Sequence, residues 1–217
     1  MKPYKLILIF GGPASGKGTL SARLSKYNVF VPVSPGELVR AKADLDPEFA
    51  NLMKQGLLLP TSFIGELTMN HIKTNVQPSL RNDDERQSAH LVVPSNKTIL
   101  LDGFPRNEEN LSHFLTTMRG FFDLVKVIVI NCSDTLMEQR TLKRQQELNR
   151  SDDEITTFRR RLKYYHEVTE KILPLFDKEF GKDKIYHFQV DETAHDPYPD
   201  IIEKIIAINN SHIYCDE

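Results

Sequence analysis

The sequence predicts an α/β protein in which a parallel sheet is wrapped by helices. Short apolar segments recur along the chain as continuous runs rather than alternating ones, which is typical of strands covered on both faces. Stretches with helical periodicity lie between them, and strands that alternate with helices favour parallel pairing. The strand candidates are residues 6–10, 29–33, 98–101, 125–131 and 184–190.

Three helical stripes support this alternation. Each stripe places apolar side chains three or four residues apart, so that they share one helix face. One stripe ends near Gly120, and another is expected to end near Pro174. The stripes are Ile64, Leu67, His71 and Ile72; then Leu111, Leu115 and Met118; then Phe158, Leu162, Tyr165, Val168 and Ile172.

Bulk composition limits the kinds of function that are open to the chain. It has 217 residues and a net charge of −2, so a single domain is expected, without a basic field for nucleic acid or anionic membrane. Cys132 and Cys215 are too few for a metal-ligand cluster or a disulfide framework. The apolar run at 6–10 is too short to span a membrane. We therefore expect a cytoplasmic protein that binds neither membrane nor nucleic acid.

A glycine-rich turn, GGPASGKGT at residues 11–19, follows the first predicted strand. Glycines let the backbone turn tightly and point N–H groups inward, where they can hold phosphate oxygens. Lys17 reaches the outer phosphates, and a helix that begins near Gly18 adds its positive end. The strict pattern has Ser or Thr directly after the lysine, but here Gly18 comes first and Thr19 follows. The strand before the turn and the helix after it favour a nucleotide site over a structural turn.

A second motif, ILLDGFPRN at residues 99–107, places an acid at the end of a buried strand. The carboxyl ends of parallel strands form the edge where ligands of such folds bind, so Asp102 could hold Mg²⁺ or its waters. The alternative is that Asp102 caps a turn, which Gly103 and Pro105 make reasonable. A role in capping a turn does not explain the arginine that follows, Arg106.

A third motif is the arginine-rich segment at residues 139–162. Arg140 and Arg144 are four residues apart and therefore share a helix face. The alternative is a solvated charged face, which is what most runs of charge form, and Arg159 and Arg160 are expected to belong to it.

Two segments interrupt the alternation of strands and helices. Residues 34–60 carry short helical pieces between the second strand and the next long helix. Residues 77–97 are polar and have no clear period. We interpret this second segment as a surface insertion, because long structureless loops are uncommon inside a compact domain.

Together, these motifs resemble the nucleoside monophosphate kinases, the family of adenylate and UMP/CMP kinases, over nearly the whole chain. GGPASGKGT is similar to the family's glycine-rich loop, in which Gly-Thr follows the lysine, and DGFPR (102–106) matches its central motif. SPGELVR (34–40) and GLLLP (56–60) resemble the two ends of its monophosphate-binding lobe. Arg140, Arg144, Arg150 and Arg161 have the spacing of its lid arginines. The short stretch between Arg144 and Arg150 is similar to the short-lid members, which implies no zinc-binding lid.

The resemblance implies a P-loop NTPase-type three-layer α/β fold with a five-stranded parallel sheet, a small monophosphate-binding lobe and a short lid. The single kinase domain, residues 1–217, would have its core in residues 1–33, 61–143 and 155–217. The monophosphate-binding lobe would be 34–60 and the lid 144–154.

The resemblance also implies a role for each matching residue. ATP would be bound by Pro13, Ala14, Ser15, Gly16, Lys17, Gly18, Thr19, Arg140 and Arg144. The acceptor monophosphate would be bound by Ser34, Pro35, Arg40, Leu58, Leu59, Gly103, Phe104, Arg106, Asn107, Asn110, Arg150 and Arg161. Transfer would depend on Lys17, Asp102, Arg106, Arg144, Arg150 and Arg161. Mg²⁺ would accompany ATP, with Thr19 and Asp102 contacting it through water.

The resemblance favours a pyrimidine acceptor, UMP or CMP. Asn110 stands where adenylate kinases usually carry glutamine and UMP/CMP kinases carry asparagine. Pro35 lacks the hydroxyl of the threonine that adenylate kinases have there. The alternatives are an adenylate kinase with AMP as acceptor, and a P-loop ATPase or switch protein, against which the arginines supplied in cis argue. A catalytically silent family member is disfavoured by intact Lys17 and Asp102. The expected partners are small nucleotides, and the chain is expected to be a monomer.

Overall fold

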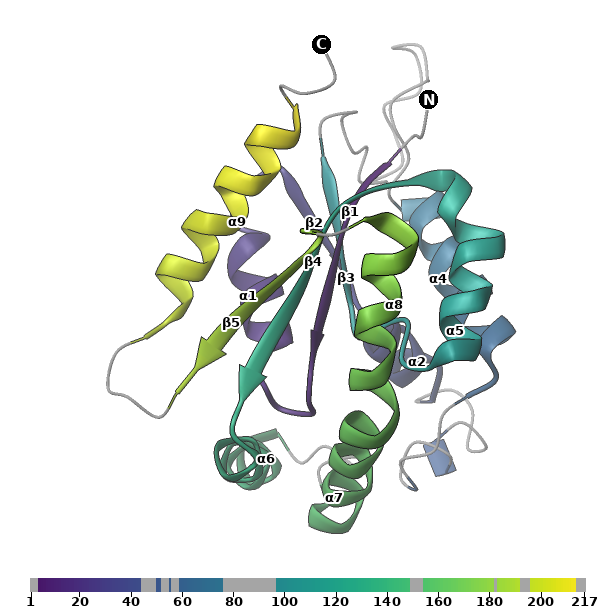
Figure 1. The fold of residues 1–217 in the computed structure, drawn as a ribbon. Coiled ribbons are helices and arrows are strands. Elements are labelled where there is room, and N and C mark those ends of the chain that lie inside the picture. Colours follow the sequence, from purple (N-terminus) through teal and green to yellow (C-terminus); the bar gives the residue numbers. More distant parts are fainter. Residues whose placement is uncertain are drawn as a thin grey trace, which may run out of the picture.

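The computed structural model describes residues 4–43, 50–51, 55, 59–75, 97–148, 154–181, 183–191 and 196–213. Within these ranges, five parallel strands form one sheet in the order β2-β3-β1-β4-β5 (Figure 1). The strands are β1 (Tyr4–Gly11), β2 (Phe30–Val33), β3 (Thr98–Asp102), β4 (Phe122–Cys132) and β5 (Ile185–Val190). The predicted α/β class, the parallel pairing and all five strands are confirmed.

Helices cover both faces of this sheet, which makes three layers (Figure 1). On one face, α1 (Lys17–Leu24) and α9 (Tyr198–Ile213) pack through Leu20, Leu24 and Ile205. On the other, α4 (Thr61–Asn75), α5 (Glu108–His113) and α8 (Glu170–Phe180) pack through residues such as Ile72 and Phe176. Because both faces are covered, the side chains of β1 from Leu6 to Phe10 are all buried, which explains its unbroken apolar run.

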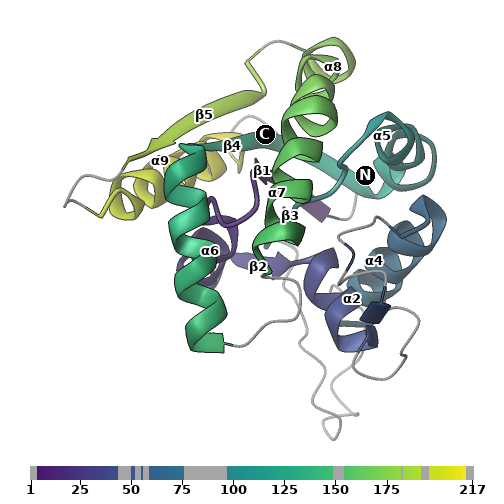
Figure 2. The same cartoon turned by 90° about the horizontal axis from the view of Figure 1, so that it is seen from below.

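Three more helices lie beyond the carboxyl ends of the strands (Figures 1 and 2). They are α2 (Pro35–Ala43), α6 (Asp134–Leu148) and α7 (Ile155–Tyr164). A π-helical turn, Tyr165–Thr169, joins α7 to α8. After α5, a second π-helical turn, Phe114–Met118, and a 3₁₀ turn, Arg119–Phe121, lead into β4.

The register of the central strands places two of the predicted motifs side by side. Ile9 of β1 is opposite Asp102, the last residue of β3, and the two residues after Ile9 pair only with β4 on the other side. The phosphate loop therefore leaves the sheet at the same edge as Asp102. Parallel sheets bind ligands at this edge, where neighbouring connections run to opposite sides.

The expected helix end at Pro174 is wrong, because α8 continues through this proline to Phe180. A proline inside a helix removes one backbone hydrogen bond. Packing of the following turn offsets this loss: Phe176 is fully buried, and its ring lies edge-on to Phe10 with centroids 5.5 Å apart. Phe176 also stacks on Phe180 at 5.9 Å. The end of the second stripe near Gly120 is confirmed.

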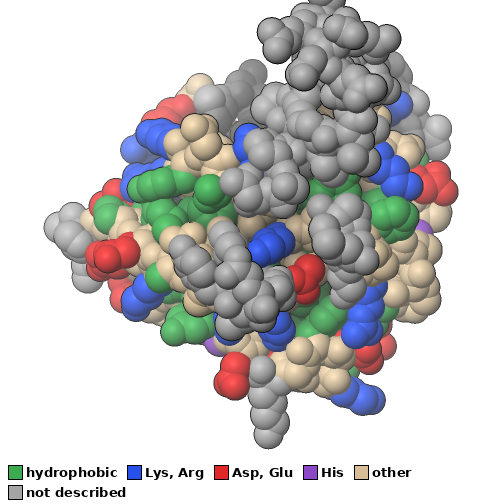
Figure 3. Space-filling model, turned by 90° about the horizontal axis from the view of Figure 1, so that it is seen from above, with side chains coloured by type: hydrophobic (Ala, Val, Ile, Leu, Met, Phe, Trp, Pro, Cys, Tyr) green, Lys and Arg blue, Asp and Glu red, His purple; other side chains and the backbone are tan. Residues whose placement is uncertain are grey.

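The surface carries charges of both signs. On the face shown in Figure 3, the described Lys and Arg side chains are interspersed with Asp and Glu and form no continuous basic patch. Among the described helices, none is both long and apolar enough to cross a membrane. Cys215 and all of the expected 77–97 insertion except Lys97 lie outside the described residues.

Candidate active site

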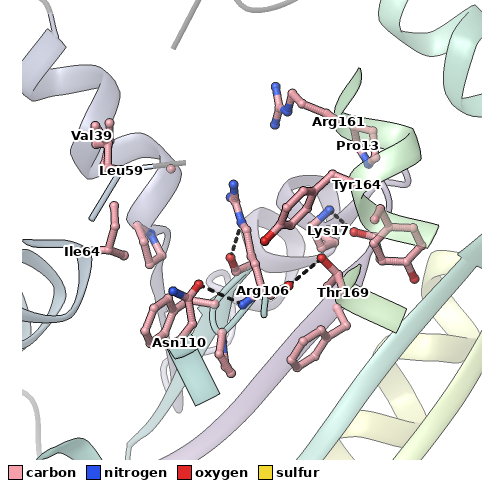
Figure 4. A pocket seen from close by; sticks show the side chains of 18 of the residues that line it. Pro13, Lys17, Val39, Leu59, Ile64, Arg106, Asn110, Arg161, Tyr164 and Thr169 are labelled. Atoms are coloured by element: carbon pink, nitrogen blue, oxygen red, sulfur yellow. Dashed lines mark hydrogen bonds between the residues drawn. The ribbon is translucent and has the colours of Figure 1, made fainter. Parts of the chain in front are cut away.

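A pocket opens at the carboxyl edge of the sheet, between α2 and α4 on one side and α7 on the other (Figure 4). Ten of its lining residues are among those that the sequence singled out: Pro13, Lys17, Pro35, Arg40, Leu59, Gly103, Phe104, Arg106, Asn110 and Arg161. The structure thus brings together parts of all three motifs and of the 34–60 segment.

The phosphate loop is closed on itself around the Lys17 ammonium. Its Nζ donates to the carbonyl oxygens of Gly11 at 2.8 Å and Gly12 at 2.7 Å. Gly16 precedes α1 with φ +106°, a left-handed conformation that favours glycine. Ser15 N donates to Gly12 O at 3.2 Å, which tightens the turn. The positive charge is therefore held at the mouth of the loop, next to the N-terminus of α1.

Asp102 is the carboxylate that faces this lysine. Burial lowers the pKa of Lys17 to about 8, although the charge of Asp102 opposes the shift. Burial likewise raises the pKa of Asp102, against the opposing charges of Lys17 and Arg106. Asp102 Oδ1 is buried and has no hydrogen-bond partner in the described part of the chain. A buried, unpaired carboxylate oxygen of this kind is suited to hold water or a hydrated cation.

Arginines from separate elements converge on the same place. A Cβ atom on Gly36 would lie 3.7 Å from Arg40 Nη1 and 3.8 Å from Arg106 Nη2, so both guanidinium groups lie beside this glycine. Arg106 is anchored by its Nε, which donates to Gly103 O at 2.7 Å. Burial, together with the charges of Arg161 and Arg40, lowers the pKa of Arg106 to about 10, so it stays cationic at neutral pH.

These cations make the site suited to a polyanion. The charges of Arg106, Arg161 and Arg144 all act on Lys17. Gathering like charges in a buried place is unfavourable unless an anion offsets their repulsion. Guanidinium groups bind phosphate oxygens in pairs, which makes phosphate the fitting anion.

The phosphate loop also contacts α6 and α9. Arg140 Nη1 donates to Ser15 O at 3.2 Å, so this arginine lies against the loop. The Tyr198 hydroxyl lies 3.4 Å from Gly16 O, and Arg23 stacks over the Tyr198 ring at 4.7 Å. Sequence reasoning missed Tyr198, because nothing in its own segment indicates contact with a loop so far away in the chain.

The two asparagines of the second motif are held by the protein itself. Asn107 caps α5, since its Oδ1 accepts from Asn110 N at 2.7 Å, and its Nδ2 donates to the Tyr164 hydroxyl at 3.0 Å. Asn110 Nδ2 donates to Thr61 Oγ1 at 2.7 Å, and its Oδ1 accepts from Arg106 N at 3.2 Å. Asn110 lines the pocket. Asn107 is not among the lining residues, but it is bonded to Tyr164, which is.

Several expected residues lie elsewhere or cannot be placed. Leu58 and Arg150 lie outside the described residues. Thr19 and Gly18 are exposed in the first turn of α1, and Ser34 Oγ accepts from Glu37 N at 3.4 Å at the start of α2.

Gly11 of the predicted phosphate loop also lines the pocket. The other lining residues are ones to which the sequence assigned no binding role: Phe10, Gly36, Val39, Ile64, Pro105, Tyr164, Tyr165 and Thr169. Tyr164 could have been found, because it follows Arg161 by three residues and shares its helix face.

This site has the arrangement of a P-loop nucleotide-binding protein: a strand leads into a glycine-rich loop, a helix begins directly after it, and the loop surrounds a lysine. Residues 10–159 match the family model described as an AAA domain. The match begins at the end of β1 and reaches α7, so the chain belongs to this family.

Curated relatives narrow the class. A UMP-CMP kinase of Mus musculus is 33% identical over 189 residues, which cover 85% of this chain and 88% of the relative. A UMP-CMP kinase of Homo sapiens is 32% identical with the same coverage, and UMP-CMP kinase 1 of Oryza sativa subsp. japonica is 31% identical over 98% of this chain and 79% of its own length. The chain belongs to the nucleoside monophosphate kinase family and is a phosphotransferase with a phosphate group as acceptor.

Proposed function

We propose that this kinase transfers the γ-phosphoryl group of ATP to UMP or CMP. The observation that carries the proposal is the convergence of Lys17, Arg40, Arg106 and Arg161 in one pocket beside the phosphate loop. This arrangement suits two polyanions that meet end to end. The names of the relatives support a pyrimidine nucleotide as the acceptor.

The acceptor pocket has a charged end and an apolar end. Val39, Leu59 and Ile64 form an apolar wall, and Asn110 lies across from it (Figure 4). An asparagine amide has two N–H donors and two oxygen lone pairs, and the protein uses one of each. The remaining donor and acceptor are the groups that pair with the edge of a pyrimidine ring.

The chemistry requires positioning and neutralisation of charge rather than a strong base. In this proposal Lys17 and Arg144 hold the phosphates of ATP, Arg140 contacts its base, and Arg40 and Arg106 hold the acceptor phosphate. Arg161 and Arg150 offset charge on the phosphoryl group as it moves. The side chains in the pocket also exclude water, which would otherwise compete as the acceptor.

Mg²⁺ is part of the proposal. The buried Asp102 Oδ1 and the Thr19 hydroxyl at the phosphate loop are oxygen groups that fit a hydrated Mg²⁺. Bound with ATP, Mg²⁺ would offset negative charge on its phosphates. Asp102 would orient its waters, and Lys17 would balance the charge of Asp102.

We also propose that the 34–60 lobe and the 144–154 lid close over the bound nucleotides, and that the enzyme works as a cytoplasmic monomer. Every arginine assigned above comes from the one chain, so no second copy is needed to complete the site. Sedimentation at assay concentration tests the monomer, and localisation of a tagged protein tests the compartment.

Steady-state assays with ATP and separate UMP, CMP, dCMP and AMP acceptors test the function. We expect kcat/KM for UMP or CMP to exceed that for AMP. Lys17→Ala, purified in parallel, controls for contaminating kinases, and its turnover should fall about 10²–10³-fold. Higher kcat/KM with AMP than with both pyrimidines would indicate an adenylate kinase. ATP hydrolysis that no acceptor stimulates would indicate an ATPase or switch.

A further inference from the structure

Tyr164 is a pocket residue that the proposed mechanism leaves without a role. It is the last residue of α7 and is half-buried. In Figure 4 its ring lies between Arg161 and Arg106, and its hydroxyl points toward Arg106. The Tyr164 side chain is also close enough to Arg106 for an electrostatic interaction. A phenol therefore stands among the groups assigned to phosphate.

The direction of its hydrogen bond determines what this phenol offers to a ligand. The Asn107 Oδ1 is committed to Asn110 N as the cap of α5, so the group that faces Tyr164 is the Nδ2 amide. An amide nitrogen only donates, and the phenol oxygen must therefore accept. The phenol proton is left for another partner, which must be an acceptor.

A second contact between the same two segments helps to hold Tyr164 in place. At the end of the π-helical turn that follows α7, Thr169 Oγ1 donates to Arg106 O at 2.8 Å. The segment that carries Tyr164 is thus tied to the segment that carries Arg106 at two points, Asn107–Tyr164 and Arg106–Thr169. A group held in this way loses little conformational entropy when a ligand binds.

We infer that Tyr164 is an acceptor-binding residue: its hydroxyl donates to an oxygen of the acceptor monophosphate, and Asn107 aligns it as a positioning residue. No proton is transferred, because the phenol remains protonated and acts only as a donor. The inference rests on the proposed function, since it assumes a nucleoside monophosphate in this pocket.

Tyr164→Phe tests the inference because it keeps the ring and removes only the hydroxyl. A hydrogen bond to a charged oxygen is strong enough that its loss should raise KM for the acceptor about 10-fold or more. KM for ATP should stay within about twofold. Calorimetric titration with UMP in the absence of ATP should show the same weakening, which makes the result independent of turnover. Tyr186→Phe, on the exposed part of β5, is the matched control and should behave as wild type.

Asn107→Ser tests the alignment. Serine is also a good helix cap, so α5 keeps its cap while the amide donor to Tyr164 is lost. We expect a higher KM for the acceptor, an unchanged KM for ATP, and no further change when Tyr164→Phe is added. If Asn107→Ser raises KM for the acceptor equally in the wild-type and the Tyr164→Phe backgrounds, the positioning role of Asn107 is wrong.

The possible failures are distinguishable. If wild type uses AMP in preference to UMP and CMP, the proposed acceptor is wrong, and the Tyr164 variants are then measured with AMP. If wild type transfers phosphate and Tyr164→Phe binds and turns over the acceptor normally, the inference itself is wrong. Thermal unfolding of each variant shows whether a loss of binding reflects a loss of folding.

Discussion

Ala14, in the middle of the phosphate loop, has a backbone conformation that alanine disfavours. Its φ is +58°, in the left-handed region, and it lies between Gly11 and Gly16, two glycines of the loop that also have positive φ. For a residue with a Cβ atom this conformation costs about 1–2 kcal/mol. The cost persists because the surrounding loop holds the residue in place, with Lys17 bonded across it to Gly11 and Gly12.

We therefore predict that Ala14→Gly stabilises the protein by about 0.5–1 kcal/mol, once the greater freedom of glycine in the unfolded chain is subtracted. Urea unfolding followed by circular dichroism gives the free energy. The control is Ala22→Gly, in the exposed part of α1, which should cost about 1 kcal/mol. If both glycines destabilise equally, Ala14 is not strained.

At the scale of elements, one histidine joins the segment after α7, which carries Arg161, to α6, which carries Arg144. His166, in the π-helical turn after α7, lies 2.9 Å from Asp134 at the start of α6 and 3.0 Å from Glu170 at the start of α8. Arg159 of α7 also pairs with Glu138 of α6 at 2.9 Å. Burial works against protonation, but hydrogen bonds to Glu170 and Asp134 outweigh it and raise the pKa of His166.

Since the pKa of His166 is raised on folding, its protonated form stabilises the folded state. The contribution is full below the unfolded value of about 6.5 and is lost as the pH rises through the folded pKa. All three side chains are partly exposed, so the effect is small, about 0.5 kcal/mol.

The measurement is the free energy of unfolding of wild type and His166→Gln at pH 5.5 and pH 8.5. We predict that the variant is less stable than wild type at pH 5.5, and that the difference shrinks at pH 8.5. Asp134→Asn, which removes one carboxylate, should reduce the difference seen at pH 5.5. If the unfolding free energies of wild type and His166→Gln differ by the same amount at both pH values, the prediction is wrong.

At the scale of the whole molecule, the arginines of the site come from helices that lie outside the central sheet and its two helical layers. Arg40 is on α2, Arg144 on α6 and Arg161 on α7, and all three helices lie beyond the carboxyl edge of the sheet (Figure 2). Mutual repulsion of these cations opposes their approach, and two bound polyanions remove it. Nucleotides should therefore draw the three helices together, as the proposed closure of lobe and lid requires.

We predict that an analogue joining adenosine to uridine through phosphates slows hydrogen exchange in α2 and in the C-terminal half of α6. ATP alone should protect the two regions less, because it offsets only part of the charge. Peptides from β1 and β4, buried in both states, are the internal control. Unchanged exchange in α2 and α6, with the analogue shown to be bound, would mean that the site does not close.

Many features were predictable because they depend on neighbours along the chain. The continuous apolar runs predicted five strands, and the glycine-rich turn after the first of them predicted the loop that closes around Lys17. Asp102 could be placed beside that loop from sequence, since the ends of parallel strands meet at one edge. Arg140 and Arg144 shared a predicted helix face for the same local reason.

The tertiary structure alone decided how distant segments contact each other. Nothing in the second motif shows that Asn107 binds Tyr164, or that Asn110 binds Thr61, since these partners lie on separate helices. Pro174 indicated a helix end, yet packing of Phe176 against Phe10 carries α8 past it. Local patterns record backbone preferences over a turn or a strand. The free energy of contacts between elements depends on shapes that exist only after the chain has folded.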